Sequence, residues 1–300
     1  MKLALTGATG FVGAALLDLA LSEGHEIRAL TRRAQSARPG VEWIAGDLSN
    51  ASALAELVRG VDAVIHVAGV VNAPDLAGFE AGNVAGTQAM LDAVAAEGVH
   101  RFVHVSSLAA REPGLSAYGA SKFHAEERVQ ASGLDWTLVR PPMIYGPRDK
   151  ELLELFRAAK WGVVPVPAEG RASIIHVEDL ARLLVALASA PSVGTIYEAD
   201  DGVTGGWRHR DMARAIGAAV GRKPLVLGVS RRMLELAAKA DGLLRGARAR
   251  LTPDRAAYFA HPDWTCARSA AVPPDLWQPR IETRAGFART ARWYRAAGWL

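Results

Sequence analysis

The sequence predicts an α/β fold in which a doubly wound parallel sheet carries a smaller, mostly helical C-terminal lobe. Short apolar runs alternate with longer amphipathic segments from residue 1 to about 140. The chain has 300 residues, 50% of them hydrophobic, so it can bury the core of one large domain and a lobe. After Arg140 a proline-rich stretch, "PPMIYGPR", interrupts the alternation and marks the end of the first domain.

The first domain is expected to contain six strands. They are predicted from short apolar runs at residues 2–6, 25–31, 41–45, 61–68, 100–107 and 135–140. Amphipathic segments between these runs predict helices at 11–23, 50–59, 79–97 and 117–131. Because strands that alternate with helices are joined by right-handed crossovers, the sheet is expected to be parallel and covered on both faces.

The sheet domain is expected to span residues 1–146 and to regain about 171–200, where "ASIIHV", a helix and "TIYEA" repeat the earlier order. A substrate-binding lobe is then formed by about 147–170 together with 201–300. Within the lobe, "VPVP" suits an edge strand, because proline has no N–H to donate.

Two helices are expected in the lobe before its C-terminal part. One is predicted at 149–160. The other is predicted from "SRRMLELAAKADGLLRG" at 230–246, which is typical of an amphipathic helix or helix pair.

Composition excludes several classes of function. The net charge is +4 and the arginines are dispersed, which argues against a nucleic-acid partner. Cys266 is the only cysteine, so no intrachain disulfide and no multi-cysteine metal site can form, and no metal is expected. No run approaches the roughly 20 apolar residues of a membrane span. The sequence therefore predicts a cytoplasmic protein without a membrane partner.

Three glycines, Gly7, Gly10 and Gly13, lie where the first strand meets the first helix in "LALTGATGFVGAALL". A helix N-terminus attracts phosphate through its unpaired N–H groups. Gly7 can take a positive φ, Gly10 lets a pyrophosphate approach, and Gly13 lets the helix pack on its strand. The loop predicts a Rossmann-type dinucleotide site, and its expected cofactor-binding residues are Gly7, Thr9, Gly10, Phe11, Val12 and Gly13.

The end of the second strand favours NADP(H) over NAD(H). In "ALTRRA", Thr31 occupies the position where an acidic residue would bind the ribose hydroxyls of NAD. Arg32 and Arg33 follow and can pair with the 2′-phosphate of NADP.

Two further strand ends are expected to contact the cofactor. Asp47 and Leu48 follow the third strand and can meet the adenine. Val67, Ala68 and Gly69 end the fourth strand with small side chains, as a backbone lying against a cofactor requires.

Tyr118 and Lys122 lie four residues apart in "YGASK" and therefore share one face of a predicted helix. A phenol titrates near pH 10 in model compounds, so it needs a neighbouring cation to act as an acid or base near neutrality. Lys122 can supply this charge. The pair predicts proton transfer at a carbonyl or alcohol while a hydride moves to or from nicotinamide.

Over nearly its whole length the sequence resembles the short-chain dehydrogenase/reductases. Within them it is most similar to the extended or atypical NAD(P)-dependent epimerase/dehydratase branch, with features of dihydroflavonol reductases and 3β-hydroxysteroid dehydrogenases. "TGATGFVG" and "YGASK" look like the TGxxGxxG and YxxxK motifs of this family, and "NVAGTQAMLDA", "RPPMIYGPRD" and "IIHVEDLARLL" resemble further segments.

The resemblance implies roles for further residues. Ser107 falls where the family's catalytic serine or threonine binds the substrate oxygen, and Asn83 where an asparagine positions the lysine and its water. Pro141, Met143 and Ile144 belong to the segment that contacts the nicotinamide carboxamide, with Tyr118 and Lys122 on the nicotinamide ribose. Members of this branch often form homodimers through helices that include the Tyr118 segment.

The sequence thus predicts an NADP(H)-dependent oxidoreductase that interconverts a carbonyl and a secondary alcohol on a small organic molecule. Two alternatives stay open. One is a nucleotide-sugar epimerase or dehydratase with tightly bound NAD, which returns the hydride to its substrate. The other is a non-catalytic dinucleotide-sensing or assembly protein.

Overall fold

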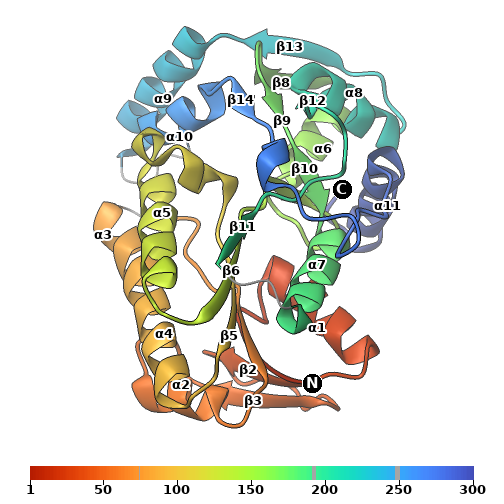
Figure 1. Ribbon diagram of the computed structural model, residues 1–300. Coiled ribbons are helices and arrows are strands. Elements are labelled where there is room, and N and C mark those ends of the chain that lie inside the picture. Colours follow the sequence, from red (N-terminus) through yellow and green to blue (C-terminus); the bar gives the residue numbers. More distant parts are fainter. Residues whose placement is uncertain (74, 191–193, 247–250) are drawn as a thin grey trace. The chain divides into compact units, whose positions relative to one another are not determined.

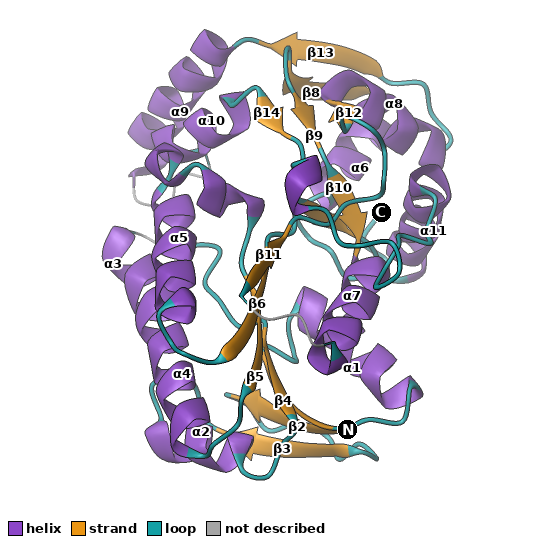
Figure 2. Ribbon diagram, in the orientation of Figure 1, coloured by secondary structure: helices purple, strands orange, loops and turns teal. Residues whose placement is uncertain are grey.

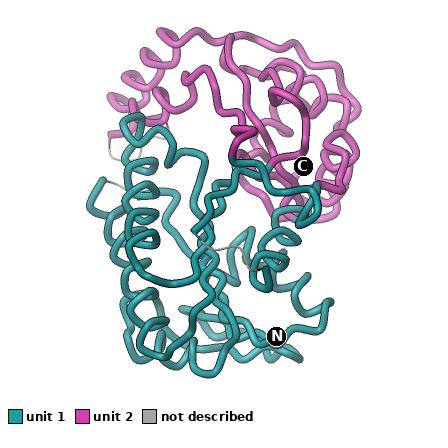
Figure 3. The backbone as a smooth tube through the Cα atoms, viewed as in Figure 1, with its two compact units in different colours: residues 1–141, 178–199, 270–278 teal, residues 142–177, 200–269, 279–300 magenta. Residues whose placement is uncertain are grey.

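The computed structural model describes residues 1–73, 75–190, 194–246 and 251–300. It divides into two compact units, which Figure 3 draws in different colours. Unit 1 consists of Met1–Pro141, Glu178–Ala199 and Ala270–Gln278, and unit 2 of Pro142–Val177, Asp200–Ser269 and Pro279–Leu300.

These boundaries differ from the expected ones at three short segments. Residues 142–146 and 171–177 were expected in the sheet domain but belong to unit 2, where their strands pair with each other. Residues 270–278 were expected in the lobe but belong to unit 1, where the N–H of Glu198 donates to the carbonyl of Ala270 at 2.8 Å.

Unit 1 is built on a seven-stranded parallel sheet with the order β11-β6-β5-β4-β1-β2-β3 (Figure 1). Its strands are β1 (Lys2–Thr6), β2 (Glu26–Thr31), β3 (Val41–Ala45), β4 (Ala63–His66), β5 (Arg101–Val105), β6 (Asp135–Val139) and β11 (Thr195–Tyr197). All six strands predicted for the first domain are present, and β11 adds the strand expected from "TIYEA". The fold class predicted from the sequence is confirmed.

Helices cover both faces of this sheet. They are α1 (Phe11–Ser22), α2 (Ala51–Val58), α3 (Leu76–Phe79), a π-helix (Glu80–Ala85), α4 (Gly86–Ala96), α5 (Ala117–Gln130) and α7 (Val177–Ser189). Figure 2 shows α2, α4 and α5 on one face, with α1 and α7 on the other. Double coverage explains the continuous apolar runs of the strands, since neither face meets water.

The apolar core on the α2, α4 and α5 side joins strand residues such as Val64 and Phe102 to helix residues such as Leu54, Met90 and Val129. Strand order reverses between β1 and β4, which lie side by side but are connected to opposite edges of the sheet. In open parallel sheets, ligands bind outside the carboxyl ends of the strands at such a reversal. The glycine loop follows β1 at this position.

Among the described residues, unit 2 combines five α-helices with short strands. The helices are α6 (Leu153–Trp161), α8 (His209–Ala219), α9 (Arg231–Arg245), α10 (Pro253–Ala260) and the C-terminal α11 (Thr283–Ala296). The strands are β7 (Met143–Tyr145), β8 (Val163–Pro167), β9 (Arg171–Ala172), β10 (Ile174–His176), β12 (Trp207–Arg208), β13 (Leu225–Val229) and β14 (Asp263–Trp264). The helix expected at 149–160 begins only at Leu153, because the Asp149 carboxylate first accepts the N–H groups of Glu151 and Leu152.

The amphipathic helix expected at 230–246 is present as α9, but little of it is buried in unit 2. Helix α9 begins after Ser230, whose hydroxyl accepts the N–H of Met233, and it packs on α10 through a narrow face around the buried Ala238. Met233, Leu236, Leu243 and Leu244 are exposed. Periodicity predicted an apolar stripe on this helix, but it could not predict which side of the helix meets protein.

No helix among residues 1–73, 75–190, 194–246 and 251–300 combines the length and apolarity that crossing a membrane requires.

Candidate functional site

Two of the three glycines in the first loop, Gly7 and Gly13, lie where close backbone contacts leave no room for a side chain. Gly7 has φ 74°, and a Cβ there would lie 2.9 Å from the N atom of Ala68, in the segment after β4. A Cβ on Gly13 would lie 2.0 Å from the carbonyl oxygen of Gly7. The start of α1 therefore packs directly on the loop, and the loop on the end of β4.

Gly10 has a different environment, because a Cβ there would approach only the Gly7 carbonyl, at 3.2 Å. Gly10 is the N-cap of α1 and supplies no side-chain cap, so the first turn beginning at Phe11 keeps N–H groups for another acceptor. Thr9 and Gly10 are exposed, whereas Phe11 and Val12 are half-buried. An open helix N-terminus beside glycines fits a bound pyrophosphate.

The ends of β2 and β3 carry the residues expected at the adenosine. Thr31 is buried and its hydroxyl donates to the Arg33 carbonyl at 2.8 Å, which folds the turn back and leaves Arg32 and Arg33 exposed. Asp47 accepts the N–H and hydroxyl of Ser49, and these hydrogen bonds, with a smaller contribution from Arg32, hold the pKa of its carboxyl below the usual range.

Leu48 is half-buried, and its side chain lies against Gly86, where a Cβ would approach the Leu48 Cδ1 to 2.7 Å. The segment after β4 lies over the glycine loop, where the N–H of Ala68 donates to the Thr6 hydroxyl at 3.1 Å. Val67 and Ala68 are half-buried and Gly69 is exposed. A Cβ on Gly69 would lie 3.0 Å from Asn83 Oδ1 and 3.6 Å from Lys122 Nζ. Gly69 therefore connects the dinucleotide loop to the predicted reactive residues.

Asn83 is buried in the π-helix Glu80–Ala85, which interrupts the single helix predicted at 79–97. Its Oδ1 accepts the N–H of Val70 at 2.6 Å, and its Nδ2 donates to the Val70 carbonyl and to the Ser121 hydroxyl. Ser121 in turn donates to the carbonyl of Tyr118. The Asn83 side chain thus ties the loop after β4 to the first turn of α5.

Lys122 is 4% exposed, and its Nζ donates to the carbonyl of Val105, the last residue of β5, at 2.8 Å. Burial lowers the pKa of this ammonium to about 8, against the opposing effect of the Glu126 carboxylate. Lys122 is therefore a cation close to its titration midpoint at mildly alkaline pH.

Tyr118 lies in the first turn of α5, half-buried, with its ring 6.0 Å from that of Phe79. Ser107 caps the 3-10 turn Leu108–Arg111 by accepting the N–H of Ala109. A Cβ on Gly119 would lie 2.8 Å from the Ala109 carbonyl. The glycine inside "YGASK" thus allows the Ser107 turn to pack against the helix that carries Tyr118 and Lys122.

A buried charged cluster beneath these residues was missing from the sequence interpretation. Glu126 is fully buried and accepts the hydroxyl of Ser106 at 2.5 Å and two guanidinium hydrogen bonds from Arg140, at 2.9 and 2.6 Å. Arg140 and Arg111 also lie 3.8 and 3.4 Å from carboxylate oxygens of Glu198. The position of Glu126, four residues after Lys122 on the same helix face, is the signal that could have revealed it.

Two buried histidines stand behind the strand ends. His66 bonds the hydroxyls of Thr6 and Thr87, and burial lowers its pKa to about 3, so it is neutral. His104 stacks on it with ring centroids 5.3 Å apart. Among the described residues, no group of three or more His, Cys, Asp or Glu side chains could hold a metal ion.

The predicted nicotinamide segment spans the boundary of the units. Pro141 is buried in unit 1, where its carbonyl accepts the N–H of Leu108, next to Ser107. Met143 and Ile144 form β7 of unit 2 and are half-buried. Their contact with the cofactor stays a prediction.

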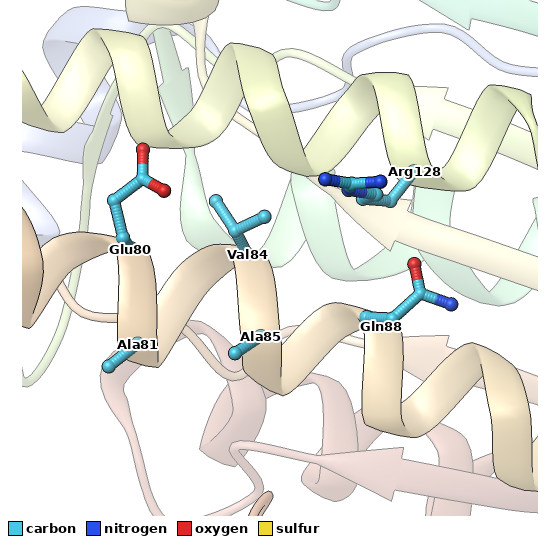
Figure 4. Close-up of a pocket in the computed structure, with 6 residues that line it drawn as sticks. All are labelled: Glu80, Ala81, Val84, Ala85, Gln88 and Arg128. Carbon is cyan, nitrogen blue, oxygen red and sulfur yellow. The ribbon is translucent and has the colours of Figure 1, made fainter.

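A shallow hollow lies on another part of unit 1 (Figure 4). It is lined by Glu80, Ala81, Val84, Ala85 and Gln88 from the π-helix and α4, and by Arg128 from α5. None of these is a predicted site residue. The hollow lies on the helices through which a homodimer was expected, and that expectation stays a prediction.

A family model described as NAD(P)H-binding matches residues 7–191. Over 311 aligned residues the chain is 39% identical to a ceramide reductase of Caulobacter vibrioides, covering 99% of this chain and 95% of that protein. It is 32% identical to a 2-alkyl-3-oxoalkanoate reductase of Stenotrophomonas maltophilia, over 64% of this chain and 67% of the relative.

Solved structures share the fold. The UDP-glucuronic acid 4-epimerase of Bacillus cereus in complex with NAD superposes with a TM-score of 0.77 at 16% identity, covering 99% of both chains. A protein described as MoeE5 in complex with UDP-glucose and NAD gives a TM-score of 0.75 at 23% identity, again over 99% of both chains.

Proposed function

Because this chain belongs to the NAD(P)H-binding family, as an extended short-chain dehydrogenase/reductase, we propose that it uses NADPH to reduce a ketone to a secondary alcohol. Membership makes it an NAD(P)-dependent oxidoreductase or an epimerase/dehydratase. The reductive direction and the choice of cofactor are the proposal.

The environment of Lys122 supports the assignment of Tyr118 as the proton donor in this reduction. Its ammonium is buried at the carboxyl end of β5, beside Gly69 and on the helix face of Tyr118. Burying a lysine with one carbonyl partner costs stability. Such a cost is typical of a group retained for chemistry, because a positive charge here stabilises a neighbouring phenolate.

In the proposed reaction, bound NADPH supplies a hydride to the carbonyl carbon of the substrate. Tyr118 donates its phenolic proton to the carbonyl oxygen, which becomes the hydroxyl of the product. Ser107 donates a hydrogen bond to the same oxygen and polarises the carbonyl. Lys122 stabilises the phenolate that Tyr118 leaves behind, and Asn83 holds the first turn of α5 through Ser121.

Preference for NADPH is supported by the end of β2. No acidic side chain follows Leu30 there: Thr31 is turned inward, and two exposed arginines come next. Guanidinium groups bind phosphate in bidentate geometry, whereas ribose hydroxyls of NAD favour a carboxylate.

The proposed substrate is a molecule that carries an oxo group on a long alkyl chain. The relative that aligns over nearly the full length is a ceramide reductase, and another is named for 2-alkyl-3-oxoalkanoates. Both names describe reductions of lipid-like molecules, and identity to the first extends through unit 2, where substrate selection is expected.

The test is NADPH oxidation with 3-oxoalkanoates of increasing chain length, for the native protein and for Tyr118→Phe. We expect Tyr118→Phe to lower kcat by about 10²- to 10⁴-fold, since it removes a general acid, while the Kd for NADPH stays within about twofold. The control is Tyr258→Phe in α10 of unit 2, which removes the same hydroxyl group from a different tyrosine. This variant should keep the activity of the native protein.

Three outcomes would contradict the proposal. Normal turnover by Tyr118→Phe would remove the assigned acid. Purification with tightly bound NAD, together with turnover of a nucleotide sugar, would support an epimerase or dehydratase. NADPH binding without reduction of any carbonyl compound would support a sensing protein.

A further inference from the structure

Large exposed apolar side chains are concentrated in unit 2. Among the described residues, nine of the thirteen lie in four short segments of this unit: 161–163, 225–227, 233–244 and 259. Single exposed apolar residues are ordinary on protein surfaces, but concentration in a few adjoining elements marks an interaction surface.

Helix α9 contributes a continuous apolar stripe. Relative to Leu236, Met233 lies three residues before and Leu243 and Leu244 lie seven and eight residues after, positions that share one helix face. Leu243 is 89% and Leu244 85% exposed. The opposite side, around Ala238, packs on α10, so α9 is attached to unit 2 by its narrower face.

The paired strands β8 and β13 add a second apolar face. Val163 and Leu225 lie opposite each other in the parallel register, and both are exposed, as is Leu227. Trp161, which ends α6 just before β8, is 88% exposed. Only Ser230 separates β13 from α9, and Figure 1 draws these two elements along one margin of unit 2.

Positive charge accompanies these apolar faces. Segments 160–163 and 222–245 contain seven basic residues, which are Lys160, Arg222, Lys223, Arg231, Arg232, Lys239 and Arg245, against the two acidic residues Glu235 and Asp241. The excess of five is larger than the +4 of the whole chain. All seven basic residues are exposed.

We infer that the exposed faces of α9 and of the β8–β13 pair form a docking surface for an anionic lipid bilayer, with α9 lying in the plane of the membrane interface. This surface goes beyond the proposed reduction and does not depend on it. It also departs from the expectation of no membrane partner, which was derived from the absence of a spanning segment.

Three features favour a lipid surface over a second protein. Interfacial helices combine an apolar face with flanking lysine and arginine, as α9 does. Tryptophan is enriched where protein meets the boundary of a bilayer, and Trp161 is exposed beside Lys160. Basic side chains attract anionic headgroups, whereas a symmetric pairing of two copies would bring these like charges together.

The experiment is vesicle flotation of the full-length protein. One set of vesicles contains phosphatidylcholine alone, and the other adds about 30 mol% phosphatidylglycerol as the anionic lipid. We expect at least about tenfold more bound protein on the anionic vesicles, with the bound fraction falling as salt screens the basic residues.

Two variants test the surface. Leu243→Ser combined with Leu244→Ser should lower binding at least about tenfold, because it removes the most exposed apolar side chains. Lys239→Glu should weaken binding to anionic vesicles only. Val203→Ser, an exposed apolar residue of unit 2 outside the four segments, is the matched control and should bind like the native protein.

Circular dichroism and thermal melting show whether each variant is folded, and turnover of a short, water-soluble 3-oxoalkanoate shows whether the catalytic site is intact. A native protein that stays unbound on anionic vesicles would overturn the inference. So would unchanged binding by the double serine variant, or a native dimer that this variant converts to monomers, which would identify a protein interface instead. Loss of turnover by Tyr118→Phe with unchanged flotation would leave the surface established independently of the reaction.

Discussion

The two units use polar and apolar side chains in opposite ways. Unit 1 buries Glu126 and Lys122 behind the carboxyl ends of its strands, and the half-buried Arg140 pairs with Glu126. Unit 2 exposes Leu243 and Leu244 on a helix held by its narrower face. Buried polar groups with satisfied hydrogen bonds fix geometry, whereas exposed apolar groups leave binding energy available to a partner. The polar groups of unit 1 thus hold side chains in fixed positions, whereas the exposed apolar side chains of unit 2 are available to bind a partner.

The largest expected effect comes from breaking the buried ion pair of unit 1. Arg140→Met leaves the carboxylate of Glu126 without its bidentate partner, so the free energy of unfolding should fall by about 3–5 kcal/mol. Arg231→Met removes an exposed pair with Glu235 in unit 2 and should leave the urea midpoint nearly unchanged. If both variants lost the same free energy of unfolding, burial of the ion pair in unit 1 would not account for its contribution to stability.

The next effect depends on pH. The pKa of Lys122 is lowered by burial from 10.5 to about 8, so below pH 8 both native and unfolded chains carry the proton and the cost of burying it is fully present. Between about pH 8 and 10.5 the unfolded chain binds more protons, and native stability rises with pH. Lys122→Met should therefore be more stable than the native protein at pH 7, by roughly 3 kcal/mol, and lose this advantage by about pH 10.5.

Urea denaturation of both proteins across this pH range measures the difference, and Lys239→Met on the exposed side of α9 is the control, expected to stay within about 0.5 kcal/mol of the native protein. A Lys122→Met advantage that is independent of pH would show that packing, and not the buried charge, sets its stability. Turnover of this variant should be lost, since the cation on the Tyr118 face of α5 is gone.

The smallest effect compares one substitution in two helices. Gly13→Ala in α1 forces a Cβ to within 2.0 Å of the Gly7 carbonyl and should cost about 1–3 kcal/mol and weaken NADPH binding. Gly242→Ala in α9 meets nothing within 4 Å and should gain up to about 1 kcal/mol, because alanine favours helix. Thermal unfolding measures the loss of stability in one variant and the gain in the other. A Gly13→Ala variant more stable than the native protein would contradict the close packing of the loop on its helix.

The sequence predicted the sheet, the glycine loop and the spacing of Tyr118 and Lys122, because these depend on local patterns of apolar residues and glycine. It did not predict the pairing of Glu126 with Arg140, which brings together residues from α5 and the end of β6. Nor could it predict the environment of α9. A helical period shows that a stripe exists, and only tertiary packing decides whether protein or solvent faces it.

Because Asn83 lies in a π-helix, its position depends on how many residues this turn contains as well as on which residues they are. A π-helix closes hydrogen bonds over five residues instead of four, so Glu80–Ala85 holds more chain per turn than the α-helix that follows it. Deleting one residue from this turn would let an ordinary α-helix form while rotating Asn83 away from Val70 and Ser121. A single-codon deletion there would therefore disconnect the loop after β4 from the first turn of α5.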